Sequence, residues 1–220
     1  MAVIAVLVPV TLIANGLAVV ATDAFVRWEL GRDGFPSDRY GLSDEQRKEL
    51  ALLGLRSIEP GSEGVVLLER ATLPDGSPAF GERELAHMED VRTLFVPLQR
   101  GRLVVILAIA VLAVALARTR LRTAVPRGLL AGALATLVVA ALLLPVILLG
   151  FDGFFTRFHE VFFEGDSWRF SSTDTLLRIY PERFWEDVSQ LVAAITVGQA
   201  LFLAPLAWWW LRAARRRDAA

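Results

Sequence analysis

Cysteine is absent from the 220 residues of this chain, and histidine occurs only twice, as His87 and His159. Without cysteine no disulfide can crosslink the loops, and no thiolate can serve as a nucleophile or a metal ligand. The formal net charge of −1 gives no sign of nucleic-acid binding, which is typical of strongly basic chains. The two histidines are therefore the first candidates for acid/base chemistry near neutral pH.

Charged residues are missing from three long runs, residues 1–22, 128–151 and 188–211. Each run exceeds the roughly 20 residues that a helix needs to cross a bilayer. A shorter apolar run, residues 103–117, lies between two arginines whose stems can reach the interface. Its uniformly apolar composition favours a fourth span over an amphipathic surface helix. The first run lacks a preceding basic segment, so we interpret it as a retained helix and not as a cleaved signal peptide.

The sequence therefore predicts an all-α integral membrane protein with four transmembrane helices and two extracytoplasmic segments that contain short amphipathic or interfacial helices. Arginines cluster in residues 118–127 and 212–217, which the positive-inside rule places in the cytoplasm together with both termini. The expected order is transmembrane helix 1 at 1–22, an outer segment at 23–102, transmembrane helix 2 at 103–117, a basic cytoplasmic loop at 118–127, transmembrane helix 3 at 128–151, an aromatic outer segment at 152–187, transmembrane helix 4 at 188–211 and a basic cytoplasmic tail at 212–220.

Two helices are expected in the first outer segment. Ser43 and Gln46 have the spacing of a capping box, which predicts a helix that stops at Gly54 or Pro60. A second helix is predicted to begin at Pro78 and to run to about residue 96, because proline is favoured at the first helical position.

The predicted second helix carries His87. On a helical wheel Glu84 and His87 share one face with apolar residues such as Val91. Because burying an unpaired charge is costly, Glu84 and His87 are expected to be partners of each other or of a substrate. The alternative is a histidine that only docks this helix onto the rest of the outer segment.

His159 lies in a phenylalanine-rich stretch. At helical spacing the phenylalanines of residues 151–162 form one stripe, which is typical of an interfacial helix at headgroup depth, and His159 falls at its edge. Downstream, Asp174 and Arg178 are four residues apart and are expected to pair on one helical turn. Gly165-Asp-Ser167 is similar to a nucleophile motif of ester hydrolases, but that motif requires a strand-turn-helix setting near the N-terminus and a later Asp-x-x-His, and neither is present here.

Specific motifs surround both histidines. They are Phe80-Gly-Glu-Arg-Glu-Leu-Ala-His-Met-Glu-Asp-Val-Arg-Thr-Leu-Phe95, Phe158-His159, Gly165-Asp-Ser-Trp168, Asp174-Thr-Leu-Leu-Arg178, Tyr180-Pro181 and Phe184-Trp185. Together they closely resemble a bacterial family of four-span membrane proteins that includes the lipoprotein intramolecular transacylase. The resemblance covers the whole topology, although the spans match only as hydrophobic sequence.

The resemblance implies a defined reaction at the bacterial cytoplasmic membrane. The transacylase moves the sn-2 acyl chain of a diacylglyceryl-modified lipoprotein from glycerol to the α-amino group of the N-terminal cysteine, which gives the lyso form. The implied partners are diacylated bacterial lipoproteins and membrane lipid, without cofactor, metal or nucleic acid. His87 and His159 match the family's candidate catalytic histidines, at the outer leaflet. Matches with supporting or substrate-binding roles are Glu84, Asp90, Asp166, Trp168 and Arg178.

The chemistry of two histidines suits that reaction, because the attacking amine must lose a proton and the leaving glycerol oxygen must gain one. One imidazole is expected to act as base and the other as acid or hydrogen-bond donor, in roles that the sequence does not distinguish. Arg178 or backbone N–H groups are candidates to stabilise the oxyanion. Glu84 or Asp152 is a candidate to fix an imidazole tautomer, and Asp174 is a further supporting candidate. An acyl-enzyme on Ser167 is not required, since the substrate supplies both ester and amine.

Two other functions remain open from the sequence. Glu84-x-x-His87 together with His159-Glu160 offers enough nitrogen and oxygen donors for a zinc site, which would make the protein an outer-face metallohydrolase. Alternatively the protein is a non-enzymatic membrane partner, in which the aromatic segment binds lipid or protein and the histidines are structural. A bis-histidine haem site is disfavoured, because neither histidine lies within a predicted span.

Overall fold

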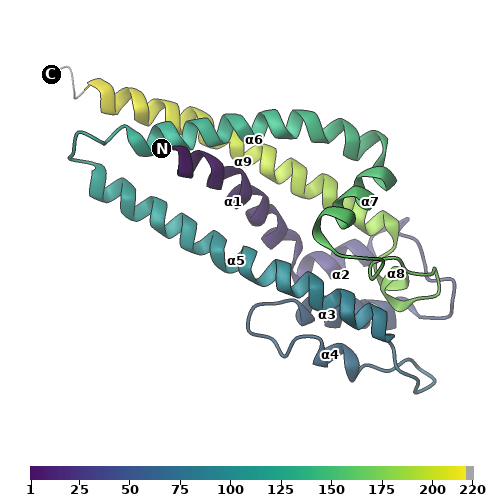
Figure 1. The fold of residues 1–220 in the computed structure, drawn as a ribbon. Helices are drawn as coiled ribbons and strands as arrows, with labels where there is room; N and C mark the ends of the chain where they lie inside the picture. Colours follow the sequence, from purple (N-terminus) through teal and green to yellow (C-terminus); the bar gives the residue numbers. More distant parts are fainter. Residues whose placement is uncertain (217–220) are drawn as a thin grey trace. The chain divides into compact units, whose positions relative to one another are not determined.

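The computed structural model describes residues 1–216, and these residues form helices joined by loops (Figure 1). Within that range there is no β-strand, and Thr72 and Pro78 form an isolated β-bridge. The all-α class predicted from the sequence is confirmed. The helices are α1 (Ala2–Val20), α2 (Asp23–Gly31), α3 (Asp44–Ser57), α4 (Val66–Glu69), α5 (Glu82–Leu116), α6 (Ala124–Leu149), α7 (Phe151–Phe162), α8 (Thr175–Ile179) and α9 (Glu182–Arg216).

The chain divides into two compact units. The spanning unit comprises residues 1–17, 100–148 and 190 onward, and the histidine unit comprises residues 18–99 and 149–189. The helices α5 and α9 each begin in the histidine unit and end in the spanning unit. Both histidines therefore belong to the same unit.

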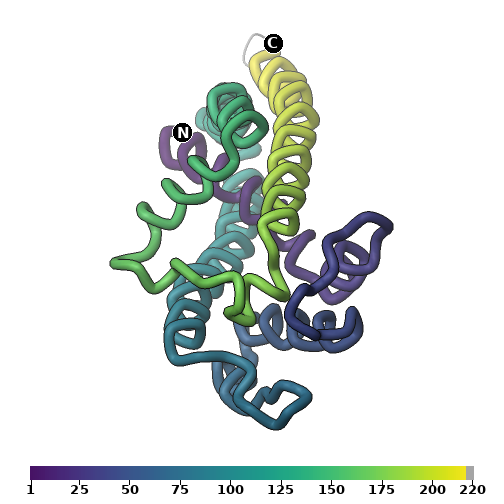
Figure 2. Tube along the Cα trace, turned by 90° about the vertical axis from the view of Figure 1, so that its right-hand side faces the viewer, coloured from purple at the N-terminus to yellow at the C-terminus, as the bar shows by residue number. Residues whose placement is uncertain are grey.

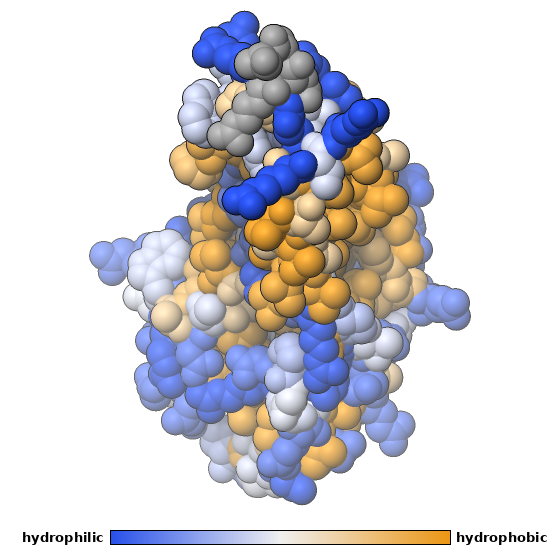
Figure 3. Space-filling model, turned by 90° about the vertical axis from the view of Figure 1, so that its left-hand side faces the viewer, coloured by the Kyte–Doolittle hydropathy of each residue, from blue (hydrophilic) through white to orange (hydrophobic). Residues whose placement is uncertain are grey.

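Four helices among residues 1–216 are long and apolar enough to cross a membrane, namely α1, α5, α6 and α9. Their apolar stretches leave large hydrophobic side chains exposed, and Figure 3 shows a broad area of such side chains on one face of the molecule. Exposed apolar surface on this scale is suited to lipid and not to water. The predicted four-span membrane protein is confirmed. Examples of these exposed side chains are Val104, Leu107, Val138, Leu142 and Phe202.

The helix α5 differs from the prediction in its start and its length. The sequence predicts a helix from Pro78 and a separate span at 103–117, whereas the structure has one continuous helix. Pro78 lies in the β-bridge, and the helix starts after Gly81, whose N–H donates to Glu84 Oε2 at 2.7 Å. That contact is half of a capping box, and it places the start four residues later than the proline signal does. The polar residues before the apolar run therefore extend the short span.

The helix α3 begins where the sequence predicts. The Gln46 N–H donates to Ser43 Oγ, and the Ser43 N–H donates to Gln46 Oε1, so the capping box is complete. The helix continues through Gly54 to Ser57, so Gly54 is not its stop. Glycine is required there for close packing, because a Cβ at Gly54 would lie 2.9 Å from the Tyr180 hydroxyl oxygen.

Glycine also allows α1 and α6 to pack closely in the spanning unit. A Cβ at Gly128 would lie 2.8 Å from the Cβ of Ile4, and a Cβ at Gly132 would lie 2.5 Å from the Cβ of Val8. Small residues four positions apart are a common means of bringing helix backbones together in membranes. The close contact with α1 therefore leaves no room for a side chain at Gly128 or Gly132 of α6.

We expect Gly132→Val to lower the melting temperature of the purified protein in detergent, because overpacking of this kind costs about 1–3 kcal/mol. The matched control is Gly198→Val on α9, where a Cβ meets nothing within 4 Å. Both melting temperatures can be measured by the same thermal-shift assay. Equal melting temperatures for the two variants would contradict the close packing of α1 on α6.

Candidate active site

The two histidines, 72 positions apart in the chain, lie next to each other in the histidine unit. His87 is on the first turns of α5 and His159 is on α7, and their ring centroids are 5.9 Å apart with an angle of 28° between the ring planes. Each histidine is only 8% exposed. A single small reacting group can therefore be reached by both imidazoles.

Aromatic rings surround the histidine pair. His87 contacts Phe163 and Phe170, with ring centroids 4.9 Å and 5.4 Å away. His159 contacts Phe155 at 4.1 Å and Trp168 at 4.9 Å. Figure 2 shows the chain between α7 and α8 passing beside the first turns of α5. This aromatic environment shields the imidazoles from water.

Burial keeps both imidazoles neutral at pH 7. Desolvation lowers the pKa of His87 to about 4, with a further lowering from the charge of His159. Desolvation also lowers the pKa of His159, although the carbonyl of Phe155 opposes this shift. Neutral imidazole has a lone pair on one nitrogen and a proton on the other, so each ring can accept and donate without first changing its charge.

A hydrogen bond fixes the tautomer of His159. Its Nδ1 lies 2.8 Å from the carbonyl oxygen of Phe155, one helical turn earlier in α7. Because a carbonyl oxygen only accepts, Nδ1 of the neutral ring must carry the proton, and Nε2 has the free lone pair. By contrast, Nδ1 of His87 is buried and has no hydrogen-bond partner among residues 1–216. The two imidazoles are therefore held in different ways.

The pH dependence of stability should report the burial of His87. In the unfolded chain the ring binds a proton near pH 6.5, whereas the folded protein takes up this proton only near pH 4. Stability from His87 is therefore present above pH 6.5 and is lost as the pH falls through this window, by about 3 kcal/mol in total. We expect the melting temperature of the wild type to fall more between pH 7 and pH 4 than that of His87→Phe, which keeps a buried ring. The same fall in both proteins would contradict a buried, neutral His87.

Glu84 and His87 were predicted to be partners of each other or of a substrate, and the first of these alternatives is wrong. Glu84 is 6% exposed, and its Oε2 accepts from the N–H of Gly81 while its Oε1 accepts from the N–H of Leu176, both at 2.7 Å. Burial raises the pKa of Glu84, and these backbone N–H groups oppose that rise. Because Leu176 lies in α8, the carboxyl group joins the start of α5 to α8. Glu84 therefore positions the helix that carries His87, and its carboxylate oxygens are bound to backbone N–H groups.

The predicted pairing of Arg178 with Asp174 is also wrong. Arg178 instead forms a two-pronged ion pair with Asp38, with Nε to Oδ1 at 3.0 Å and Nη2 to Oδ2 at 3.1 Å. The two side chains are 8% and 1% exposed. Although burial alone would raise the pKa of Asp38, the hydrogen bonds from Arg178 and from the backbone hold it below its usual range. Asp174 Oδ2 accepts from the N–H of Ser171. The sequence carries no local signal for Asp38, which lies in a loop.

The remaining acidic candidates lie in other settings. Asp90 is exposed on α5. Asp166 forms an exposed ion pair with Arg169 at 3.2 Å. Asp152, the second candidate for holding an imidazole, lies beside Glu182 and raises the pKa of that carboxyl group. The structure therefore brings Trp168 to the histidine pair, whereas Asp90 is exposed and Asp152 and Asp166 lie beside other charged side chains.

The side chains predicted for the alternative zinc site do not converge on one point. Within residues 1–216 no group of three or more His, Cys, Asp or Glu side chains is arranged to hold a metal. The Glu84 carboxylate is directed to backbone N–H groups, as described above. The histidine pair thus offers two nitrogen ligands without a third protein donor, whereas catalytic zinc usually has three.

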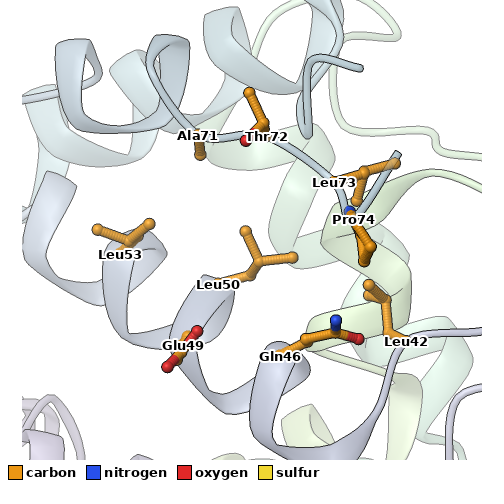
Figure 4. A pocket seen from close by; sticks show the side chains of 9 residues that line it. All are labelled: Leu42, Gln46, Glu49, Leu50, Leu53, Ala71, Thr72, Leu73 and Pro74. Atoms are coloured by element: carbon orange, nitrogen blue, oxygen red, sulfur yellow. The ribbon is translucent and has the colours of Figure 1, made fainter. Parts of the chain in front are cut away.

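A cavity of about 280 Å³ lies elsewhere in the histidine unit, between α3 and the segment 71–74 (Figure 4). Leu50 points from α3 toward that segment, and neither histidine lines the space. The histidine pair itself is packed by aromatic side chains. The cavity is lined by Leu42, Gln46, Glu49, Leu50, Leu53, Ala71, Thr72, Leu73 and Pro74.

Comparison with known proteins agrees with this geometry. The family model described as lipoprotein intramolecular transacylase Lit matches residues 2–185. The chain belongs to the lipoprotein intramolecular transacylase family. An uncharacterized protein of Aquifex aeolicus is 34% identical over 181 residues, which cover 80% of this chain and 77% of that protein. Members of the family are membrane acyltransferases, so the predicted family and the predicted class of enzyme are confirmed.

Solved structures of the family share the fold. The membrane-integral Lit of Bacillus cereus matches with a TM-score of 0.79 and 19% identity over 97% of this chain and 95% of that chain. A form of the same protein in which one histidine is replaced by arginine matches with a TM-score of 0.66 and 18% identity over 99% and 92% of the two chains. The four-span architecture is therefore that of Lit.

Proposed function

We propose that this protein moves the sn-2 acyl chain of a diacylglyceryl-modified lipoprotein from the glycerol oxygen to the α-amino group of its N-terminal cysteine. The observation that carries the proposal is the pair of neutral imidazoles 5.9 Å apart inside an aromatic enclosure. Family membership supplies the class of reaction. The product is an N-acyl lipoprotein that keeps one acyl chain on its glycerol.

The proton transfers balance without any cofactor. The amine nitrogen attacks the ester carbonyl carbon and loses one proton, and the bond between that carbon and the sn-2 oxygen then breaks while this oxygen gains one proton. His159 accepts the amine proton, because its Nδ1–H is bound to the carbonyl of Phe155 and leaves Nε2 as the acceptor. The imidazolium of His159 then gives this proton to the leaving sn-2 oxygen, while neutral His87 donates a hydrogen bond to the same oxygen, so both rings end in the state in which they began. Conversion of an ester to an amide is downhill, so no nucleotide is needed.

A serine nucleophile finds no support in the contacts of Ser167. Its hydroxyl oxygen is buried and has no hydrogen-bond partner among residues 1–216, so no base in contact with it can activate it. Direct attack by the substrate amine is therefore the simpler route. This agrees with the intramolecular character of the reaction.

The proposed partners are diacylated bacterial lipoproteins within membrane lipid. We place the histidine unit at the outer leaflet of the bacterial cytoplasmic membrane and both termini in the cytoplasm. Support comes from the arginines of residues 118–127 and 212–217, which are typical of cytoplasmic segments next to spans. Newly lipidated cysteines would then reach the histidines within the outer leaflet.

The absence of cysteine makes this topology easy to test. We expect the single-cysteine variant Glu63→Cys to react with a membrane-impermeant maleimide in intact cells, because Glu63 is in the histidine unit and its side chain is 62% exposed. Arg120→Cys, in the basic loop, should react only after the cells are permeabilised. Labelling in the opposite order would overturn the proposed orientation.

The function is tested by expressing the protein in a strain whose lipoproteins remain diacylated and identifying their N-termini by mass spectrometry. The expected product has an amide-linked acyl chain on the cysteine and one fewer ester-linked chain on the glycerol. Lipoproteins that stay diacylated, in cells where the protein is folded in the membrane, would count against the transacylase and favour the non-enzymatic membrane partner.

A further inference from the structure

Attack on an ester places negative charge on the carbonyl oxygen, and an enzyme must supply a hydrogen-bond donor for it. In the proposed reaction the two histidines handle the amine and the leaving oxygen. Arg178, which the sequence suggests for the oxyanion, is bound to Asp38 inside the histidine unit. The donor for the carbonyl oxygen must therefore come from another group near the histidines.

Trp168 has a donor that is not used. The residue is 9% exposed, and its Nε1 is buried without a hydrogen-bond partner among residues 1–216. Leaving a buried N–H unpaired costs free energy, so native structures rarely keep one without a reason. An indole N–H can only donate, so the group that satisfies it must be an acceptor such as a carbonyl oxygen.

The position of Trp168 fits that role. Its ring is 4.9 Å from the ring of His159 and inclined to it by only 32°. The turn that carries Trp168 is held by the Arg169 N–H, which donates to the carbonyl of Asp166 at 3.1 Å, and the Arg169 guanidinium lies 5.1 Å from the Trp168 ring. The indole and the imidazole are therefore close enough for one small substrate group to contact both rings.

We propose that Trp168 Nε1–H donates a hydrogen bond to the carbonyl oxygen of the migrating acyl group. The inference rests on the proposed function, since it needs an ester under attack by an amine. As the carbon–nitrogen bond forms, the carbonyl electron pair moves onto the oxygen and is held by the indole N–H. This pair returns when the bond to the glycerol oxygen breaks, and Trp168 neither gains nor loses a proton. Trp168 is thus a third catalytic residue, beside the two histidines.

The test replaces one atom of the indole. In the purified full-length enzyme Trp168 is exchanged for 3-benzothienylalanine, in which sulfur takes the place of the N–H and the ring shape is kept. We expect kcat on a synthetic diacylglyceryl lipopeptide to fall about 10²–10³-fold, as for the loss of one oxyanion donor. The melting temperature should match that of the wild type. Trp168→Phe should show a similar fall in kcat, and Trp28→Phe, at a site 59% exposed in the same unit, should leave kcat unchanged.

The outcomes separate the two proposals. If the wild type does not convert the lipopeptide, the proposed function fails. If the wild type converts it and the benzothienyl enzyme does so at the same rate, the role of Trp168 as donor is overturned. A slow Trp168→Phe enzyme beside a normal benzothienyl enzyme would assign Trp168 a packing role and would equally overturn the inference.

Discussion

Alanine in place of either histidine should nearly abolish acyl migration. We expect the rate for His87→Ala and for His159→Ala to fall by about 10²–10⁴-fold, the usual contribution of a positioned acid or base. The reason is geometric, because the two rings are 5.9 Å apart, so both imidazoles reach one reacting centre, and aromatic side chains surround them. The measurement is the rate at which purified protein converts a diacyl lipopeptide, followed by mass spectrometry.

Matched controls come from the same helices. Glu82 on α5 and Glu160 on α7 are exposed, so Glu82→Gln and Glu160→Gln should keep the wild-type rate. The rate of the double variant His87→Ala/His159→Ala should fall by a smaller factor than the two single factors multiplied together. The reason is that the effects of residues in one catalytic unit are not additive. A fully active single variant would remove that histidine from the mechanism.

The second large effect is expected at the buried ion pair of Arg178 and Asp38. Removing one partner leaves an uncompensated buried charge, so Arg178→Ala should destabilise the protein by about 3–5 kcal/mol. Activity should fall as well, because the same short helix, α8, binds Glu84 at the start of α5 through the N–H of Leu176. Thermal unfolding in detergent measures the first effect, and lipopeptide conversion measures the second.

The comparison for this effect is an exposed ion pair of the same kind. Arg70 and Glu63 are 3.0 Å apart, with side chains 71% and 62% exposed. Arg70→Ala should therefore change stability by no more than about 1 kcal/mol. If Arg178→Ala melted at the same temperature as Arg70→Ala, the buried pair would not hold this part of the histidine unit together.

Local signals in the sequence were enough for the membrane architecture. Long charge-free runs predict the four spans, and the Ser43–Gln46 spacing predicts the start of α3, because each depends on residues close together in the chain. The start of α5 was misjudged, since the proline signal at Pro78 competes with a capping contact from Glu84 to Gly81. In the structure Pro78 forms a β-bridge with Thr72 and lies outside the helix, which begins at Glu82.

The site depended on contacts that no local pattern encodes. Nothing in the sequence indicates that His87 and His159 are adjacent, because their distance is set by the packing of α7 against the start of α5. The wheel placed Glu84 beside His87, but the N–H groups of Gly81 and of Leu176 in α8 bind this carboxylate instead. The family resemblance gave Trp168 only a supporting or substrate-binding role, and its unpaired Nε1 became visible only in the folded chain.

In the proposed reaction, one site with two neutral histidines moves an acyl chain within a single lipopeptide. The most direct measurement uses a synthetic diacylglyceryl lipopeptide with a deuterated sn-2 chain, incubated with the purified enzyme together with an unlabelled lipopeptide of different peptide mass. We expect deuterated acyl amide only on the peptide that carried the deuterated ester, and no such transfer by the folded double variant His87→Ala/His159→Ala. Label on the other peptide, or undiminished transfer by the double variant, would contradict it.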